Sequence, residues 1–273
     1  MTNPRRSKTS SPGSPSSREN TPTEKYSLTA MSTPSALDLS APAPPPTSLD
    51  GLGSPLLLLN LKTYSGHLGP GAERTARLLE ELGKSSGVTV AIAPATPDLA
   101  RVAGAVTIPV LAQHVDPIEG GAHTGFVPPE SIRAAGAWGS LVNHSEHPIP
   151  AVDVRDAVQR LSALGLVAVV CARNVAATRR LALARPSYLA VEPPELIGGD
   201  RAVSTARPEV VSGAVAAVRS VAPGTRVLCG AGVHDRRDVQ RALELGSSGV
   251  LVSSAVTRAA DPRVAIEELL AGF

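Results

Sequence analysis

The sequence predicts a (β/α)8 barrel that follows a disordered N-terminal tail. From Pro55 to the C-terminus, eight short apolar runs typical of buried strands alternate with segments of helical period. Eight strand–helix units in about 220 residues fit a closed barrel. A doubly wound sheet would also alternate in this way, but no dinucleotide-type glycine fingerprint is present, which favours closure.

Residues 1–53 are the predicted tail, and residues 54–273 are the predicted catalytic barrel. The tail is dense in Ser, Thr and Pro and contains one aromatic residue, Tyr26. Such a segment cannot bury enough apolar surface to offset the entropy lost on ordering. It lacks the apolar core of a secretory signal, and its glutamates and prolines argue against a transit peptide. Met31 offers a second translation start, so the role of the tail stays open.

Composition limits the class of protein and its partners. The chain is 42% hydrophobic but only 2% aromatic, so we expect an aliphatic core. Lys+Arg 26 nearly balance Asp+Glu 24, and no basic cluster is interleaved with aromatic residues, which argues against nucleic acid. The longest apolar runs, such as Leu166–Cys171, are far shorter than the roughly 18 residues of a membrane span. Cys171 and Cys229 lie apart in apolar runs, so we expect buried, reduced thiols, no metal site and a cytoplasmic location.

The pattern assigns a range to each element in order. The expected strands are Leu56–Leu61, Val88–Ala93, Pro109–Gln113, Ala137–Asn143, Leu166–Cys171, Tyr188–Val191, Arg226–Gly230 and Gly249–Ser253. The expected helices are Ala72–Lys84, Pro97–Val102, Pro129–Ala135, Val152–Leu164, Val175–Ala184, Pro208–Val221, Asp235–Leu245 and Pro262–Leu270.

In a barrel, chemistry is expected at the carboxyl ends of the strands and in the loops that follow. These positions hold an amine at Lys62, an imidazole at His144 and a carboxylate at Glu192. Taken singly, each has an ordinary interpretation as a solvated or locally hydrogen-bonded side chain. Barrel closure, however, brings all three to one mouth.

Glu192 ends an apolar strand and is followed by two prolines and then by Gly198 and Gly199. This order is typical of a rigid base beside a hinged lid. Gly232, Ser253 and Ser254 follow the last two strands, where barrels commonly bind a phosphate through backbone N–H groups. The set suggests proton transfer next to the carbonyl of a small phosphorylated sugar.

Several motifs in order resemble the triosephosphate isomerases of compact, archaeal type. The similarity runs from about Pro55 to the C-terminus and excludes the tail. It is carried by Asn60–Tyr64, Ala112–His114, His123–Gly125, Asn143–Glu146, Val191–Gly198 and Cys229–Gly232. The resemblance implies a cofactor-free aldose–ketose isomerase of glycolysis and gluconeogenesis. Such an enzyme interconverts dihydroxyacetone phosphate and D-glyceraldehyde 3-phosphate through an enediol(ate).

The resemblance also implies a role for each site residue. Glu192 would be the base, neutral His144 the electrophile, and Lys62 the stabiliser of negative charge. A glutamate base, a neutral histidine and a closing loop are a well-known property of that family, so these roles are carried over from it. The remaining positions implied are Asn60, Ile197, Gly232, Ser253 and Ser254 for substrate binding, and Glu146 as a local ion-pair partner that orders the site.

Some features leave alternatives open. Asp200 follows the lid glycines, where the family usually has Gly-Thr-Gly, and His147 stands where a basic partner of Glu146 is expected. A four-carbon substrate such as erythrulose phosphate, or a catalytically weak phosphate-binding barrel, is therefore a second interpretation. The loop holding His114 and His123 implies a homo-oligomer, a dimer or a tetramer. The sequence further predicts that His67 and His234 are solvated.

Overall fold

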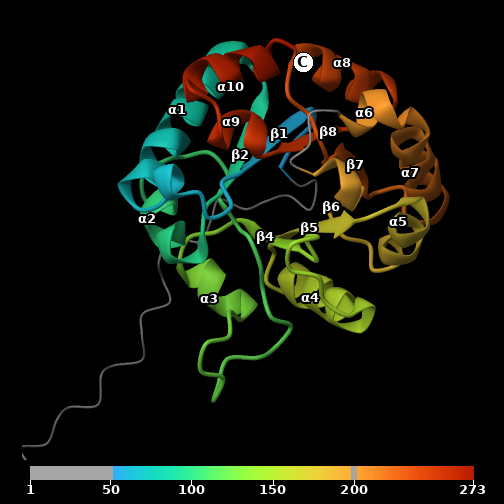
Figure 1. Cartoon of the computed structure of the whole chain (residues 1–273). Coiled ribbons are helices and arrows are strands. Elements are labelled where there is room, and N and C mark those ends of the chain that lie inside the picture. Colours follow the sequence, from blue (N-terminus) through green and yellow to red (C-terminus); the bar gives the residue numbers. More distant parts are fainter. Residues whose placement is uncertain (1–51, 198–201) are drawn as a thin grey trace, which may run out of the picture. The chain divides into compact units, whose positions relative to one another are not determined.

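The computed structural model describes residues 52–197 and 202–273. Eight parallel strands follow one another in the order β2-β1-β8-β7-β6-β5-β4-β3. A bridge between Ile92 and Val110 joins the two ends of this order, so the sheet closes on itself. Figure 1 shows the strands in the centre of a ring of helices. The predicted (β/α)8 barrel is confirmed.

Each predicted strand is present, with ends that differ by a residue or two. The strands are β1 (Leu56–Asn60), β2 (Thr89–Ala93), β3 (Leu111–Ala112), β4 (Gly139–Val142), β5 (Val167–Ala172), β6 (Tyr188–Val191), β7 (Arg226–Cys229) and β8 (Gly249–Val252). The third strand is the shortest, because only Leu111 and Ala112 pair with the neighbouring strand β4. Pro109 precedes them and has no N–H to donate to a ladder.

The eight predicted helices are also present. The main helices are α1 (Pro70–Ser86), α2 (Leu99–Ala103), α3 (Pro129–Ala134), α4 (Ala151–Ala163), α5 (Val175–Ala182), α7 (Pro208–Val221), α8 (Arg236–Glu244) and α10 (Pro262–Leu270). Shorter pieces were not predicted: η1 (Ser65–His67), η2 (Thr96–Asp98), η3 (Pro194–Leu196), α6 (Val203–Ala206) and α9 (Ser254–Thr257). Segments of three or four residues are too short to show a helical period.

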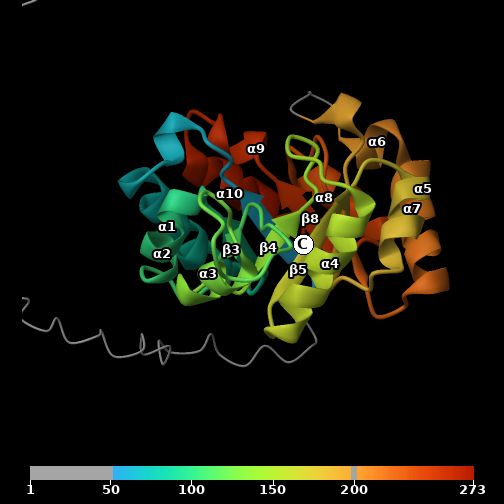
Figure 2. The ribbon, with the colours of Figure 1, turned by 90° about the horizontal axis from the view of Figure 1, so that it is seen from below.

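Two apolar layers hold the barrel together. The inner layer comes almost entirely from alternate strand residues, among them Leu56, Leu58 and Leu228. The outer layer joins the other face of each strand, such as Leu57 and Leu59, to the helices that lie along the outside (Figure 2). Strands buried on both faces explain why each reads as a continuous apolar run rather than as an alternating one.

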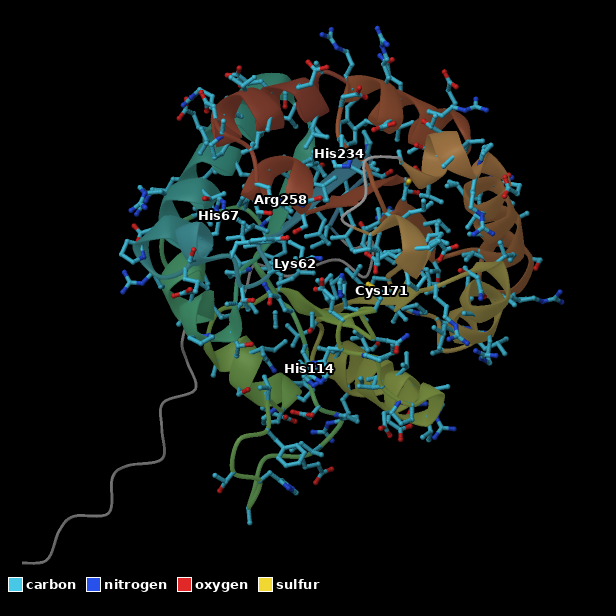
Figure 3. All side chains as sticks on the ribbon, viewed as in Figure 1. Lys62, His67, His114, Cys171, His234 and Arg258 are labelled. Atoms are coloured by element: carbon cyan, nitrogen blue, oxygen red, sulfur yellow. The ribbon has the colours of Figure 1, made fainter. Side chains whose placement is uncertain are left out.

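Two histidine predictions need correction. His67 was expected to be solvated, but it is 7% exposed. Its Nδ1 lies 2.9 Å from Thr75 Oγ1 and its Nε2 lies 3.2 Å from the carbonyl oxygen of Thr257. His67 therefore links α1 to α9, and Figure 3 places it on the α1 side of the ring. His234 is half-buried rather than solvated, and its backbone N–H donates to Asp238 Oδ2 at 3.0 Å.

Parts of the predictions lie outside the described residues. These are the tail up to residue 51 and the lid positions Gly198, Gly199 and Asp200. The last two tail residues are described: Leu52 is buried, and the Gly53 carbonyl accepts a hydrogen bond of 2.8 Å from the Tyr188 hydroxyl. None of the helices within residues 52–197 and 202–273 combines the length and apolar character that a membrane crossing requires.

Candidate active site

The predicted site residues meet around one small cavity at the carboxyl ends of the strands. Those lining it are Asn60, Lys62, His144, Glu192, Ile197, Gly232, Ser253 and Ser254. Glu146 lies beside the cavity and contacts both Lys62 and His144. Barrel closure thus brings together groups that are far apart in the sequence.

Glu192 is held rigidly at the end of β6. Its backbone N–H donates to the Ala172 carbonyl at 2.8 Å, and the residue is only 2% exposed. Among the described residues, its Oε2 has no hydrogen-bond partner. Burial raises the pKa of Glu192 to about 8, the Cys171 thiol and the Lys62 ammonium oppose this rise, and Glu146 adds to it. A buried, unsatisfied carboxylate is costly and marks a site prepared for a ligand or a proton.

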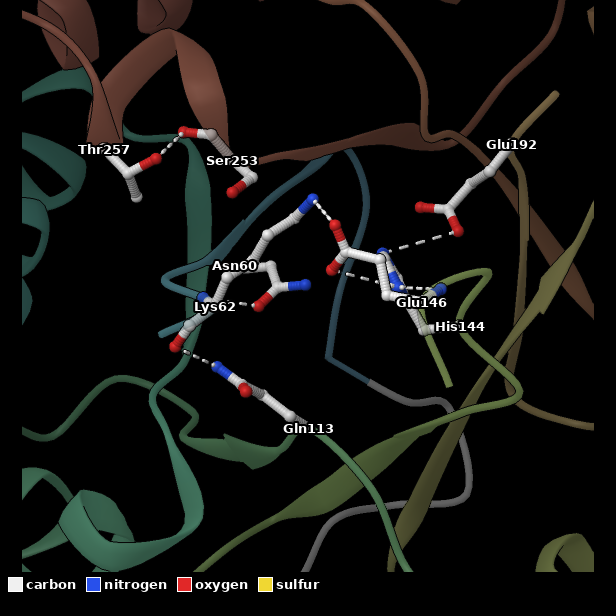
Figure 4. A network of polar contacts seen from close by, with 8 residues as sticks. All are labelled: Asn60, Lys62, Gln113, His144, Glu146, Glu192, Ser253 and Thr257. Carbon is white, nitrogen blue, oxygen red and sulfur yellow. Dashed lines mark hydrogen bonds and ion pairs between the residues drawn. The ribbon is translucent and has the colours of Figure 1, made fainter. Parts of the chain in front are cut away.

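His144 presents one particular nitrogen to the cavity. Its Nδ1 accepts the Glu146 backbone N–H at 3.2 Å, which assigns the ring proton to Nε2. Nε2 lies 3.8 Å from Glu192 Oε2, and a dashed line in Figure 4 marks this pair. Burial lowers the pKa of His144, Glu146 opposes this effect, and Lys62 adds to it. The geometry therefore favours a neutral imidazole that can donate a hydrogen bond.

The loop that carries His144 is fixed by the preceding residue, Asn143. Its side-chain amide donates to the Cys171 carbonyl at 2.9 Å and accepts the Ile149 N–H at 3.1 Å. Asn143 has a φ of 62°, a left-handed conformation that asparagine tolerates better than most residues. The short side chain thus ties the loop to β5 and turns His144 toward the cavity.

Lys62 is oriented by three neighbours. Its Nζ lies 2.6 Å from Glu146 Oε1, and its backbone N–H donates to Asn60 Oδ1 at 2.9 Å. Gln113 Nε2 donates to the Lys62 carbonyl at 3.0 Å. The Lys62 side chain is 15% exposed and its φ is 50°, so the backbone is held in an uncommon conformation. The ammonium is consequently placed at the mouth rather than in bulk solvent (Figures 3 and 4).

His147 does not serve as the basic partner of Glu146, because Lys62 takes that place. The His147 ring instead stacks on His114, with centroids 4.0 Å apart. His114 Nε2 lies 3.2 Å from Asp116 Oδ1. His147 therefore packs against the neighbouring loop, and the Lys62–Glu146 pair stays intact.

The side of the cavity opposite His144 is built from small residues. The Ser253 hydroxyl is buried and, among the described residues, has no hydrogen-bond partner. Ser254 begins α9, and Gly232 has a φ of 66°. Glycine allows the backbone to approach a ligand closely, and N–H groups at a helix start favour an anion. This side can hold a phosphate group.

Sequence reasoning missed three residues that shape the site. Gln113 fixes the Lys62 backbone, and Cys171, expected only to be an inert thiol, lies against the Glu192 carboxyl group. Gly230 belongs to the Cys229–Gly232 motif, but its contact with the base is not apparent from the sequence: a Cβ built there would lie 2.5 Å from Glu192 Cγ and 2.9 Å from Oε1. Only the folded structure shows these contacts, because they join separate strands.

Gly230→Ala is therefore expected to displace the Glu192 carboxylate. A shift of about 1 Å can lower kcat about a hundredfold, and we expect KM to change much less. Steady-state kinetics of the variant test this expectation. Gly224→Ala is the matched control, because no atom lies within 4 Å of a Cβ added there. An unchanged kcat in Gly230→Ala would show that the Glu192 carboxylate accommodates the added methyl group without being displaced.

The described residues contain no group of three or more His, Cys, Asp or Glu side chains placed to hold a metal ion. What they do contain is a buried carboxylate facing a neutral imidazole, with a cation and an anion-holding loop beside them. The fold and this mouth define a barrel enzyme equipped for acid–base chemistry on a small anion.

Comparison with known proteins gives the family. Residues 55–270 match the family model described as triosephosphate isomerase. The chain is 45% identical over 219 residues to the triosephosphate isomerase of Methanosarcina acetivorans, covering 80% of this chain and 99% of that protein. It is 46% identical over 216 residues to that of Methanothermus fervidus, covering 79% and 97%. The chain belongs to the triosephosphate isomerase family.

A solved structure supports the fold independently. The crystal structure of triosephosphate isomerase from Bartonella henselae matches with a TM-score of 0.65 at 18% identity. The match covers 80% of this chain and 98% of the other. At this identity the likeness concerns the fold alone.

Proposed function

We propose that this chain interconverts dihydroxyacetone phosphate and D-glyceraldehyde 3-phosphate by moving a proton between adjacent carbons. The relatives that match over nearly their full length are triosephosphate isomerases. The observation that carries the proposal is the pair of buried, unsatisfied atoms, Glu192 Oε2 and Ser253 Oγ, in one cavity. One is suited to receive a proton, and the other is suited to hold an anion. Such an activity belongs to glycolysis and gluconeogenesis.

In the proposed reaction, Glu192 removes a proton from the substrate carbon next to the carbonyl. Burial that raises its pKa also makes the ionised carboxylate a stronger base. His144 Nε2–H donates to the carbonyl oxygen, where negative charge develops. Because its pKa is lowered, the imidazole of His144 is neutral, and it can then pass its Nε2 proton to the enediolate oxygens and recover it.

Lys62 and Asn60 complete the proposed chemistry. The ammonium, already paired with Glu146, stabilises the negative charge of the enediolate, and Asn60 positions the substrate. Gly232, Ser253 and Ser254 hold the phosphate, with Ile197 closing the cavity beside them. Glu146 holds Lys62 and His144 in place and contacts neither of the two reacting carbons of the substrate.

A coupled assay in both directions tests the substrate. We expect turnover of the three-carbon substrates to exceed that of erythrulose phosphate, because the described cavity is small and the matched relatives are triosephosphate isomerases. The comparisons do not support the four-carbon and weak-binding alternatives. Preferential turnover of the four-carbon substrate, or no turnover of either, would overturn the proposal.

The barrel, residues 54–273, is proposed to be the complete catalytic unit. All proposed site residues lie between Asn60 and Ser254. Deleting residues 1–50 is therefore expected to leave kcat and KM within about twofold of the full chain, since changes remote from a site are usually close to neutral. Parallel kinetics of the two chains test this. A large loss would assign the tail to the site or to assembly.

We also propose that the chain is a homo-oligomer. The loop between β3 and α3 extends away from the ring in Figure 1 and carries Phe126, which is 53% exposed. Beside it lies an open cavity of about 670 Å³ that reaches Lys62 and Glu146. A second copy covering this face would bury both features.

Phe126→Glu is expected to lower the molar mass measured by light scattering to that of a single chain. Val264→Glu is the control, since Val264 is 59% exposed on α10, away from this loop. The mass of the unaltered chain distinguishes a dimer from a tetramer. A monomeric unaltered chain would overturn the proposal.

A cytoplasmic location is likewise proposed, with the two free buried cysteines in support.

A further inference from the structure

A second cavity lies at the opposite end of the barrel, where the chain enters β5 and β6. Its volume is about 440 Å³, within the range of small-molecule sites. Its walls come from the last turns of α4 and α7 and from the residues just before the two strands. None of the site residues described above lines it.

Among the described residues that line this cavity, Arg185 is the one that carries a charge. Arg185 is exposed, and within the described residues its guanidinium has no ion pair or hydrogen bond, although its backbone N–H donates to the Ala182 carbonyl. Its φ is 52°, a left-handed conformation three residues beyond the end of α5. Glycine or asparagine fits such a position with less strain.

Only three described non-glycine residues have a positive φ: Lys62, Asn143 and Arg185. The first two lie at the mouth, where they hold the proposed catalytic groups in place. Strained backbone clusters at functional sites, because a binding function can offset its cost. Arg185 shares this conformation at the other end of the barrel, and it carries a long cation where a short side chain would be less strained.

The remaining walls divide into a polar and an apolar part. Val158, Leu166 and Val221 supply aliphatic surface. The Ser187 hydroxyl oxygen accepts the Ala168 N–H at 3.4 Å and keeps its own proton to donate. The described lining residues include no carboxylate that would neutralise Arg185 or repel an anion.

We propose that this cavity binds a small carboxylate with a short apolar body. The planar guanidinium matches the two oxygens of a carboxylate, and the aliphatic walls accommodate the body. A single cation suits a monoanion better than a phosphate dianion, which favours several donors. The site is independent of the isomerase mouth and of the function proposed for it.

Calorimetric titration of hexanoate into the full chain tests the proposal, with hexanol and inorganic phosphate as probes for the body and the charge alone. We expect saturable hexanoate binding that Arg185→Asn weakens at least tenfold, because a charge-assisted hydrogen bond is lost. Asparagine tolerates the left-handed conformation, so isomerase activity and Tm are expected to be retained. Arg219→Gln, an exposed arginine of α7 that is not among the residues lining the cavity, is the matched control.

Arg185→Gly gives a second variant that relieves the strain and removes the cation, and we expect it to lose hexanoate binding with no fall in Tm. Hexanoate binding that is equally strong in both Arg185 variants would overturn the proposal. So would the absence of saturable binding in the unaltered chain, or hexanol binding as tightly as hexanoate.

Discussion

Glu192→Asp is expected to lower kcat about a hundredfold or more while leaving the free energy of unfolding almost unchanged. Shortening the side chain by one carbon withdraws the carboxylate from the substrate carbon, and proton transfer depends steeply on that distance. The charge and the surrounding contacts are otherwise retained. Coupled kinetics together with urea unfolding measure both quantities.

Glu195→Asp is the matched control for this substitution. Glu195 lies three residues further along, in η3, and its side chain is 57% exposed and paired with Arg207. Its shortening is expected to leave kcat within about twofold, because an exposed ion pair contributes little. An unchanged kcat in Glu192→Asp would refute the assignment of the base.

The pH dependence of stability should differ between the unaltered chain and Glu192→Gln. The folded-state pKa of Glu192 is raised from 4.5 to about 8, so the folded state favours the protonated carboxyl group. Below pH 4.5 both folded and unfolded states hold the proton and no penalty exists. As the pH rises from 4.5 to about 8, the unaltered chain loses stability relative to Glu192→Gln, and above about 8 the loss is complete.

The total loss is expected to be a few kcal/mol, at about 1.4 kcal/mol for each unit of pKa shift. Urea unfolding of both chains at pH 5 and pH 9 measures it, and subtraction cancels titrating groups that do not interact with Glu192. A difference between the chains that stays constant with pH would contradict a buried carboxyl group of raised pKa.

The sequence predicted the ends of those helices and strands at which a proline stands at or near the boundary. The helices α7 and α10 begin at Pro208 and Pro262 as expected, since proline favours the first helical turn. Strand β6 ends at Val191 as expected, just before Glu192 and two prolines. In contrast, α6 and α9 are single turns that depend on tertiary packing, and no periodic pattern in the sequence predicts them.

The meeting of the candidate site residues at one mouth could be predicted from the sequence, but their contacts could not. Strand order alone brings Lys62, His144 and Glu192 to one mouth. The proton on His144 Nε2 depends on a hydrogen bond from the Glu146 backbone, which no residue pattern reveals. His67 was mispredicted for a similar reason, because its partner Thr257 is 190 residues away.

Isomerisation of dihydroxyacetone phosphate in heavy water tests the central claim most directly. Glu192 holds the abstracted proton as a carboxyl proton, which solvent can replace before it returns to carbon, so a fraction of the D-glyceraldehyde 3-phosphate formed should carry deuterium at C2. Glu192→Gln should lose both the turnover and the label. Undiminished turnover or labelling by Glu192→Gln would contradict the account.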